Sequence, residues 1–196
     1  MQIVETNLSF SRAPSKRTRT GSIILHHSAS ADVSAATIHG WHQGQGWIGI
    51  GYHYVIRANG AIERGRPEDS IGSHAGPQGN GDSIGIVLTG NFEIGAPATA
   101  QVVALVELIK DLRNRYGNLT VIGHKDVMAT ACPGRNFPWD ELRKRLEGTQ
   151  VADQWKLDII AKAKAAELIT VDHDPDEPAS KWFVLQVILN ALKGGK

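Results

Sequence analysis

Val121-Ile122-Gly123-His124-Lys125-Asp126-Val127-Met128-Ala129-Thr130-Ala131-Cys132-Pro133 is the stretch around which this chain is organised. It contains the only cysteine in the 196 residues, and His124 lies eight positions before that cysteine. A lone thiol near an imidazole indicates one of two chemistries. One is a Cys/His nucleophilic pair, and the other is a shared zinc ion, because thiolate and imidazole are both good zinc ligands. A third ligand would decide between them.

The best candidate for a third ligand lies far upstream, in Ile23-Ile24-Leu25-His26-His27, where an apolar run with strand character ends on histidine. Two histidines and one cysteine would leave a tetrahedral zinc ion with one open position. That is the catalytic arrangement rather than the closed structural one. Successive strand residues face opposite sides of a sheet, so His26 and His27 cannot easily bind the same metal.

Several short motifs follow one another in an order that resembles a known family. They are His26 at the end of an apolar strand, Gly51-Tyr52-His53-Tyr54, Gly72-Ser73-His74-Ala75, Ser83-Ile84-Gly85-Ile86, His124 and Ala131-Cys132-Pro133. In this order they resemble the zinc N-acetylmuramoyl-L-alanine amidases, the type-2 amidases of phages and bacteria, which are similar also to animal peptidoglycan recognition proteins. The resemblance covers residues 21–146.

The resemblance implies an α/β fold, a mixed central β-sheet flanked by helices, with one zinc ion at one end of a groove. It implies that His26, His124 and Cys132 hold this ion. His26 is chosen over His27 because it matches the family's first ligand, and His27 is expected to pack in the core or beside the ligands. The zinc would hold the thiol of Cys132 as a thiolate and remove it as an attacking group. The implied activity is hydrolysis of the amide bond between N-acetylmuramic acid and L-alanine in bacterial peptidoglycan.

The resemblance also implies roles beside the metal. In these amidases the tyrosine at the position of Tyr52 reaches the zinc-bound water. Thr130 stands where phage relatives often have lysine and recognition-protein amidases have threonine. Its hydroxyl can donate a hydrogen bond to a developing oxyanion but supplies no charge. His53, His74 and Asn80 are expected to line the groove and bind substrate. The sequence does not identify the proton donor to the leaving group.

Two other functions stay open at this point. A non-catalytic peptidoglycan-binding module of the same fold usually lacks a zinc ligand, whereas all three positions are filled here. A structural zinc protein would need a fourth protein ligand, and Asp126 is near enough in sequence to be considered. Turnover of purified cell wall would separate either protein from an enzyme.

The composition limits the partners and the place of action. The net charge is +1, which gives no reason to expect binding to nucleic acid or to an anionic membrane. No apolar run approaches the roughly 20 residues that cross a bilayer, and the first residues lack the pattern of a secretory signal. We therefore expect synthesis in a host cytoplasm and release to the wall through a holin, the usual route for phage enzymes of the type resembled.

The length suits one domain and an appendage. We predict a catalytic domain over residues 1–147, followed over residues 148–196 by a linker and a small helical module that serves cell-wall targeting or self-association. The linker is predicted at residues 148–153. Amphipathic patterns predict two tail helices, at residues 153–167 and 180–192, joined by a loop.

Hydrophobic patterns also predict the elements of the catalytic domain. Strands are predicted at residues 22–25, 52–56, 61–64, 83–88 and 119–122. Helices are predicted at residues 35–42, 99–116 and 138–146, with Ser34 and Thr99 as N-caps. Asn59-Gly60 predicts a hairpin turn between the second and third strands. The glycine-rich residues 68–82 are predicted to form one wall of the groove without regular structure.

Overall fold

The structure is a computed structural model that describes residues 1–169, 184 and 187–188, and gives no side-chain placement for residues 148–157. The chain divides into two compact units, Met1–Leu142 and Arg143–Lys196. In the described part of the chain no helix is both long enough and apolar enough to span a membrane.

The first unit is built on a six-stranded sheet with the order β1-β4-β3-β5-β2-β6. All neighbouring strands run parallel except β3 and β4, so the predicted mixed sheet is confirmed. Strand β5 is buried along its whole length, as expected for a parallel strand covered on both faces. The strands are β1 (Ile3–Val4), β2 (Ser22–His27), β3 (Tyr54–Ile56), β4 (Ile62–Arg64), β5 (Ser83–Leu88) and β6 (Thr120–Gly123).

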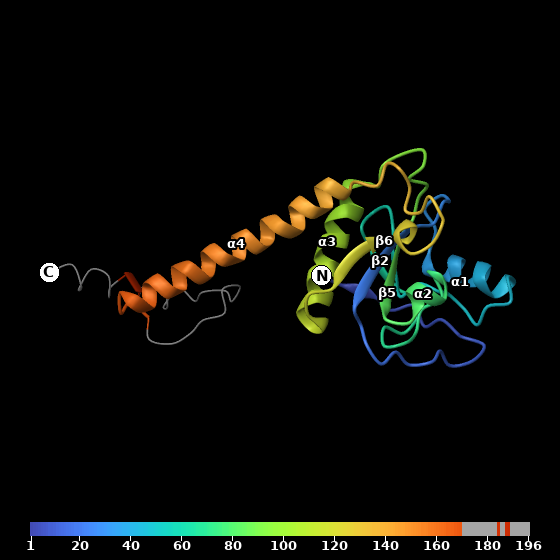
Figure 1. Cartoon of the computed structure of the whole chain (residues 1–196), viewed down its shortest axis with the longest axis horizontal. Coiled ribbons are helices and arrows are strands. Elements are labelled where there is room, and N and C mark those ends of the chain that lie inside the picture. Colours follow the sequence, from blue (N-terminus) through green and yellow to red (C-terminus); the bar gives the residue numbers. More distant parts are fainter. Residues whose placement is uncertain (170–183, 185–186, 189–196) are drawn as a thin grey trace. The chain divides into compact units, whose positions relative to one another are not determined.

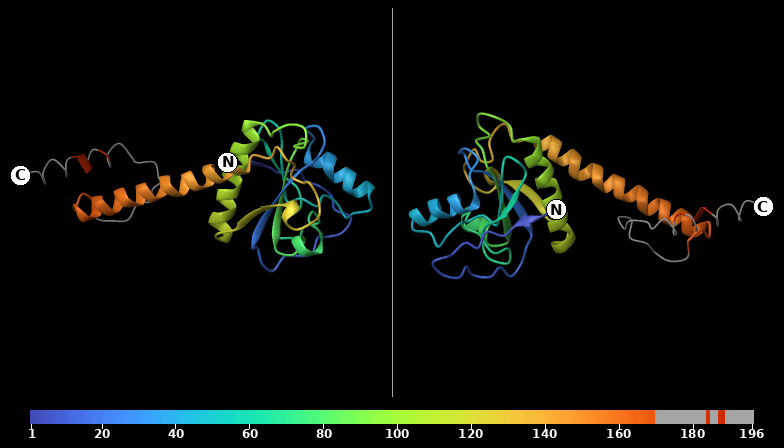
Figure 2. Two further views of the ribbon diagram at one scale, coloured as in Figure 1. Left: turned by 45° about the horizontal axis from the view of Figure 1, so that its top comes forward. Right: turned by 180° about the vertical axis from the view of Figure 1, so that it is seen from behind.

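Helices cover both faces of this sheet. Helix α3 (Thr99–Tyr116) lies on one face, and α1 (Ala35–Gly44) and the short α2 (Gly76–Asn80) lie on the other (Figures 1 and 2). A 3-10 turn, η1 (His124–Asp126), follows β6 directly. The architecture is therefore the expected sheet flanked by helices.

Helix α3 has the bounds that its amphipathic pattern predicts. Its N-cap, however, is Ala98 and not Thr99. The side chain of Gln101 accepts the N–H of Ala98 through Oε1, and its Nε2 donates to the carbonyl oxygens of Ile56 and Thr89. The glutamine thus replaces a capping hydroxyl and ties the start of the helix to the sheet. The buried stripe of the helix contains Val102, Leu105, Val106, Ile109 and Leu112.

Helix α1 begins at the predicted cap, because the Ser34 side chain accepts the N–H of Thr37. Its buried face contributes Ala35 and Ile38 to an apolar cluster with sheet residues Val55 and Val87. Trp41, by contrast, is 44% exposed. The buried residues of the helix are Ala35, Ile38 and His39.

The predicted hairpin is confirmed, with Gly60 in the left-handed region at φ 87° and its N–H bonded to the carbonyl of Arg57. Strand β3 begins at Tyr54, so Tyr52 lies just before the strand and not within it as predicted. Three elements had not been predicted, β1, α2 and η1. All three are short, and the glycine-rich segment that contains α2 shows no helical periodicity.

Helix α4 spans Trp139–Ala165 without a break. The predicted linker at residues 148–153 is therefore helical, and the helices predicted at residues 138–146 and 153–167 belong to one helix. Of the second predicted tail helix, Val184, Val187 and Ile188 are described and are helical. The loop before it and the rest of that helix lie outside the described residues, and the role of the tail stays a prediction.

Candidate metal centre and active site

Three potential metal ligands from distant parts of the sequence meet at one end of the sheet. His26 lies on β2, His124 opens η1 after β6, and Cys132 lies in the loop that follows. Strands β2 and β6 pair in parallel with Leu25 opposite Gly123, so both histidines leave neighbouring strands at the same level. One ligand atom from each of the three residues lies within 4.8 Å of the others. His26 Nδ1 is 3.7 Å from Cys132 Sγ.

The alternation of side chains along β2 separates the two consecutive histidines. His26 is fully buried and its ring centroid lies 4.6 Å from that of His124. His27 points to the other face, where its Nδ1 accepts the N–H of Phe92. The expectation that the two histidines cannot share a metal therefore agrees with the geometry.

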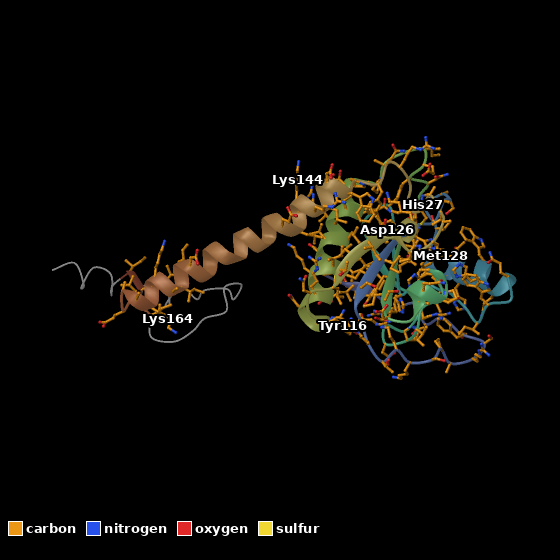
Figure 3. All side chains as sticks on the ribbon, viewed as in Figure 1. His27, Tyr116, Asp126, Met128, Lys144 and Lys164 are labelled. Atoms are coloured by element: carbon orange, nitrogen blue, oxygen red, sulfur yellow. The ribbon has the colours of Figure 1, made fainter. Side chains whose placement is uncertain are left out.

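The loop that carries Cys132 is folded back onto η1. The N–H of Lys125 donates to the carbonyl of Cys132, and Thr130 Oγ1 accepts the N–H of Cys132 at 3.3 Å. Asp126 accepts the N–H of Gly123 through Oδ2 and so caps the turn. Asp126 and Met128 can be located on the segment after β6 in Figure 3. These bonds hold the thiol beside the two imidazoles.

The electrostatics of the three groups follow from burial. Burial holds the pKa of His26 well below its usual value, and the neighbouring His124 and His27 lower it further. Burial also lowers the pKa of His124. The same cause raises the pKa of Cys132 to about 11, partly offset by a backbone hydrogen bond from His27. Both imidazoles are thus neutral and able to bind a cation, whereas the thiol stays protonated at neutral pH unless a cation is present.

Tyr52 stands beside this cluster. Its ring centroid lies 5.0 Å from that of His26 and 5.7 Å from that of His42. Burial, and secondarily the nearby Cys132, raise the pKa of Tyr52 above its usual value. The phenol therefore keeps its proton and can act as a hydrogen-bond donor. Thr130 is exposed, and its hydroxyl retains a hydrogen to donate after it accepts the Cys132 N–H.

The three residues expected to bind substrate all form hydrogen bonds with the protein framework. His53 is fully buried, its Nδ1 accepts the N–H of Gly85, and its Nε2 lies 2.9 Å from the carbonyl oxygen of Ser70. Burial lowers the pKa of His53 to about 3. Asn80 accepts the backbone N–H groups of His74 and Ala75 through Oδ1. Direct binding of substrate by these side chains stays a prediction.

The third, His74, lies directly behind His26. Its Nδ1 is 3.0 Å from His26 Nε2, and only 8% of the residue is exposed. The structure thus places all three predicted ligands together, with Tyr52, Thr130 and His74 in contact with one or another of them.

Met128 and Trp47 were not named among the candidate site residues in the sequence analysis. Met128 Sδ lies 3.3 Å from His124 Nε2, and the residue is 42% exposed. Trp47 packs its ring on His42 at 4.5 Å between centroids. It also lines a cavity of about 660 Å³ together with Arg12, Arg66 and Ser73. The spacing of Met128, four residues after His124 and thus one helical turn away, was the signal that could have placed its thioether beside the His124 imidazole.

Comparisons with known proteins agree with this geometry. Residues 16–135 match the family described as N-acetylmuramoyl-L-alanine amidase. The chain is 38% identical over 126 residues to an endolysin of Klebsiella phage KP32, covering 60% of this chain and 83% of the relative. It is 33% identical over 132 residues to peptidoglycan-recognition protein SC2 of Drosophila melanogaster, covering 61% and 71%. The solved structure of the N-acetylmuramoyl-L-alanine amidase LysC from Clostridium intestinale URNW superposes with a TM-score of 0.72 at 37% identity, covering 75% of this chain and 98% of that chain.

Proposed function

Because the chain belongs to the family of N-acetylmuramoyl-L-alanine amidases, we propose that it hydrolyses the amide bond between N-acetylmuramic acid and L-alanine in bacterial peptidoglycan. The observation that carries the proposal is the convergence of His26, His124 and Cys132 within 4.8 Å of one another. The similarity to an endolysin further supports action as a phage or prophage lysis enzyme on the cell wall. Peptidoglycan is then the partner, reached after release through a holin.

The donor set fits zinc. Two imidazole nitrogens and one sulfur are the ligands that zinc prefers, and three protein ligands leave a position for substrate or water. The two neutral imidazoles can bind without losing a proton, and a divalent cation supplies the charge that the buried thiol needs to ionise. A zinc ion held by His26, His124 and Cys132 would act as a Lewis acid, which could polarise a carbonyl group and lower the pKa of a water molecule.

The chain's own residues then supply hydrogen bonds and exclude water. Tyr52 keeps its phenolic proton and can donate it as a hydrogen bond to the oxygen that gains charge when water attacks the amide. Thr130 offers a second, uncharged donor beside Cys132. The buried rings of His26 and His74 close the inner side of the site, so a hydrogen bond from Tyr52 on that side acts in a lower dielectric than one from the exposed Thr130.

The alternative functions fit less well. A non-catalytic peptidoglycan-binding module would not need a complete set of ligands with a protonated tyrosine beside it. A structural zinc site would need a fourth protein ligand. In the part of the chain that the structure describes, the group that could hold a metal has three members, and the Asp126 carboxylate already accepts the Gly123 N–H.

Digestion of purified peptidoglycan tests the proposal. An amidase releases new N-terminal alanines and forms no new reducing ends, and a His124→Ala variant serves as the negative control. New reducing ends without alanine termini would mean that a glycosidic bond is cleaved and the proposal is wrong. Binding to walls without any new termini would leave the non-catalytic module as the function.

A further inference from the structure

The contact between His26 and His74 indicates a role for His74, which is not one of the three predicted metal ligands. The two ring nitrogens of His26 face different partners. Nδ1 lies 3.7 Å from Cys132 Sγ, on the side of the metal cluster. Nε2 lies 3.0 Å from His74 Nδ1, on the side of the protein interior. The rings meet edge to face, with an interplanar angle of 82°.

We propose that His74 is a positioning residue that accepts a hydrogen bond from His26 Nε2–H and so fixes the tautomer in which His26 Nδ1 carries the free electron pair. This inference rests on the proposed zinc-dependent function, because it is the metal that needs that electron pair. A neutral imidazole has one donor nitrogen and one acceptor nitrogen. A partner that holds the proton on one nitrogen therefore exposes the other one to the ion.

The hydrogen bonds run from His26 through His74 and Ser83 to the carbonyl oxygen of Gly79. This last group determines which atom donates in each bond. The Ser83 hydroxyl donates to the carbonyl oxygen of Gly79, which can only accept. Ser83 Oγ is then an acceptor toward His74 Nε2, which lies 3.4 Å away. With its proton on Nε2, the His74 ring has its electron pair on Nδ1, the atom that faces His26. Each hydrogen bond thus determines whether the next atom along the chain donates or accepts.

The backbone around His74 holds its ring in this orientation. A Cβ atom on Gly72 or on Gly85 would overlap with the imidazole of His74, so the ring fills space that only glycine leaves open. Asn80 Oδ1 accepts the N–H of His74 at 2.8 Å and fixes the start of the side chain. Strand β5, which carries Ser83 and Gly85, pairs with β2, which carries His26. The donor His26 and the hydroxyl of Ser83 thus lie on paired strands, while His74 lies just before helix α2 and Gly79 lies within it.

This arrangement favours a role through His26 over direct contact with substrate. Both ring nitrogens of His74 face protein groups, and only 8% of the residue is exposed. A substrate would have to displace one of these partners before it could use the ring.

Substitutions at His74 can separate a hydrogen-bonding role from a packing role. In His74→Asn, the amide oxygen takes approximately the place of Nδ1 and can still accept from His26. In His74→Phe, a ring of similar size remains but the acceptor is lost. We expect zinc affinity, measured by competition with a chromophoric chelator, to fall about 10- to 100-fold in His74→Phe. It should fall only a few-fold in His74→Asn.

A matched control comes from His39, another buried histidine with both nitrogens engaged, by Ser9 O and Ile50 N–H. His39→Phe and His39→Asn should lower the denaturation midpoint and leave the zinc affinity unchanged. If His74 only fills space, His74→Phe will retain more zinc affinity than His74→Asn, and the proposed role is overturned.

A measurement on the wild-type chain keeps the inference testable even where a variant fails to fold. Nitrogen-15 spectra of the metal-free protein should show His26 protonated on Nε2 and not on Nδ1, and the opposite tautomer would overturn the assignment. Ser83→Ala should increase the minor tautomer of His74. A wild-type protein that binds no zinc would defeat the proposed function itself, whereas zinc binding with equal loss in both His74 variants would defeat only the role of His74.

Discussion

The ring of Tyr52 is tilted by 59° against the ring of His26, and their centroids are 5.0 Å apart. A tyrosine that precedes strand β3 is thereby held against a residue of strand β2, although β5 lies between those strands in the sheet. Gly51 and Ser73 make this possible, since the Ser73 N–H donates to the Gly51 carbonyl and draws the two loops together. The contact brings an aromatic hydroxyl to the proposed metal site.

Replacement of Tyr52 by phenylalanine should remove that hydroxyl and little else. We expect an intact fold and unchanged zinc content, with turnover lowered about 10²-fold or more, the scale for loss of one preorganised donor in a transition state. Release of N-terminal alanine from purified walls measures the turnover. Wild-type turnover in Tyr52→Phe would show that the tyrosine serves packing alone.

Removal of the metal should abolish activity, and added zinc should restore it. His26→Ala should lose both zinc and activity, because the residue is one of three ligands. The matched variant His27→Ala loses the acceptor for the Phe92 N–H and the ring contact with Phe92, and should keep stoichiometric zinc with a stability loss of about 1 kcal/mol. Metal analysis of the purified variants measures their zinc content. Loss of zinc in His27→Ala but not in His26→Ala would mean that His27, and not His26, is the ligand.

Two glycines should respond in opposite ways to alanine. A Cβ on Gly51 would overlap with the Ser73 carbonyl, and that backbone cannot move aside easily. Gly51→Ala should therefore lower the free energy of unfolding by about 1–3 kcal/mol, as overpacking usually does. Gly40 lies within α1 with no neighbour near its Cβ position, so Gly40→Ala should raise stability by about 0.5–1 kcal/mol. Urea unfolding of both variants tests the contrast.

The buried histidines should make the fold sensitive to acid. The pKa of His53 is lowered to about 3 in the folded protein, whereas an unfolded histidine titrates near pH 6.5. Between these values the unfolded chain binds more protons, so the stability contributed by neutral His53 is present above pH 6.5 and is lost as the pH falls toward 3.

Urea midpoints of the metal-free protein measured from pH 7 to pH 4 test this linkage. His53→Gln should be less stable than wild type at pH 7, but its stability should depend less steeply on pH. Parallel curves for the two proteins would mean that His53 does not contribute to the acid sensitivity.

A chain truncated after Glu147 tests the predicted tail function. We expect it to fold, bind zinc and cleave small soluble muramyl peptides, because the first compact unit ends at Leu142. It should act more slowly on intact walls if the tail binds the wall and raises the effective substrate concentration. Sedimentation of both forms measures self-association. Insolubility of the truncated chain, or inactivity on soluble substrate, would assign the tail helices to the catalytic domain.

The parts of the fold that the sequence predicted are those with a strong local pattern. Strand β5 and helix α3 have the predicted bounds, because one is a continuous apolar run and the other keeps a helical stripe over its whole length. The cap at Ala98 was missed because Gln101 replaces the usual hydroxyl from within the helix. The two residues of β1 have no pattern of their own and are defined by pairing with β4.

The candidate site residues that could be predicted are those identified by their residue type and by their order in the sequence. His26, His124 and Cys132 were assigned from their chemistry and from the resemblance to a family. The link between His26 and His74 was not predicted, because it depends on a distance between residues 48 positions apart in sequence. Likewise, the burial that restricts His53 arises only when β5 and the loop at Ser70 close around it.

The pairing of β2 with β6 also determines when the candidate site can form during synthesis of the chain. His26 is synthesised 106 residues before Cys132, an interval of roughly 5–20 s at usual translation rates. Until β6 has emerged, β2 has no neighbour on that side, and His124 and Cys132, which follow β6, cannot reach His26. An incomplete chain on the ribosome therefore cannot assemble the candidate site, and the proposed hydrolytic activity requires that nearly all of the first unit has been made.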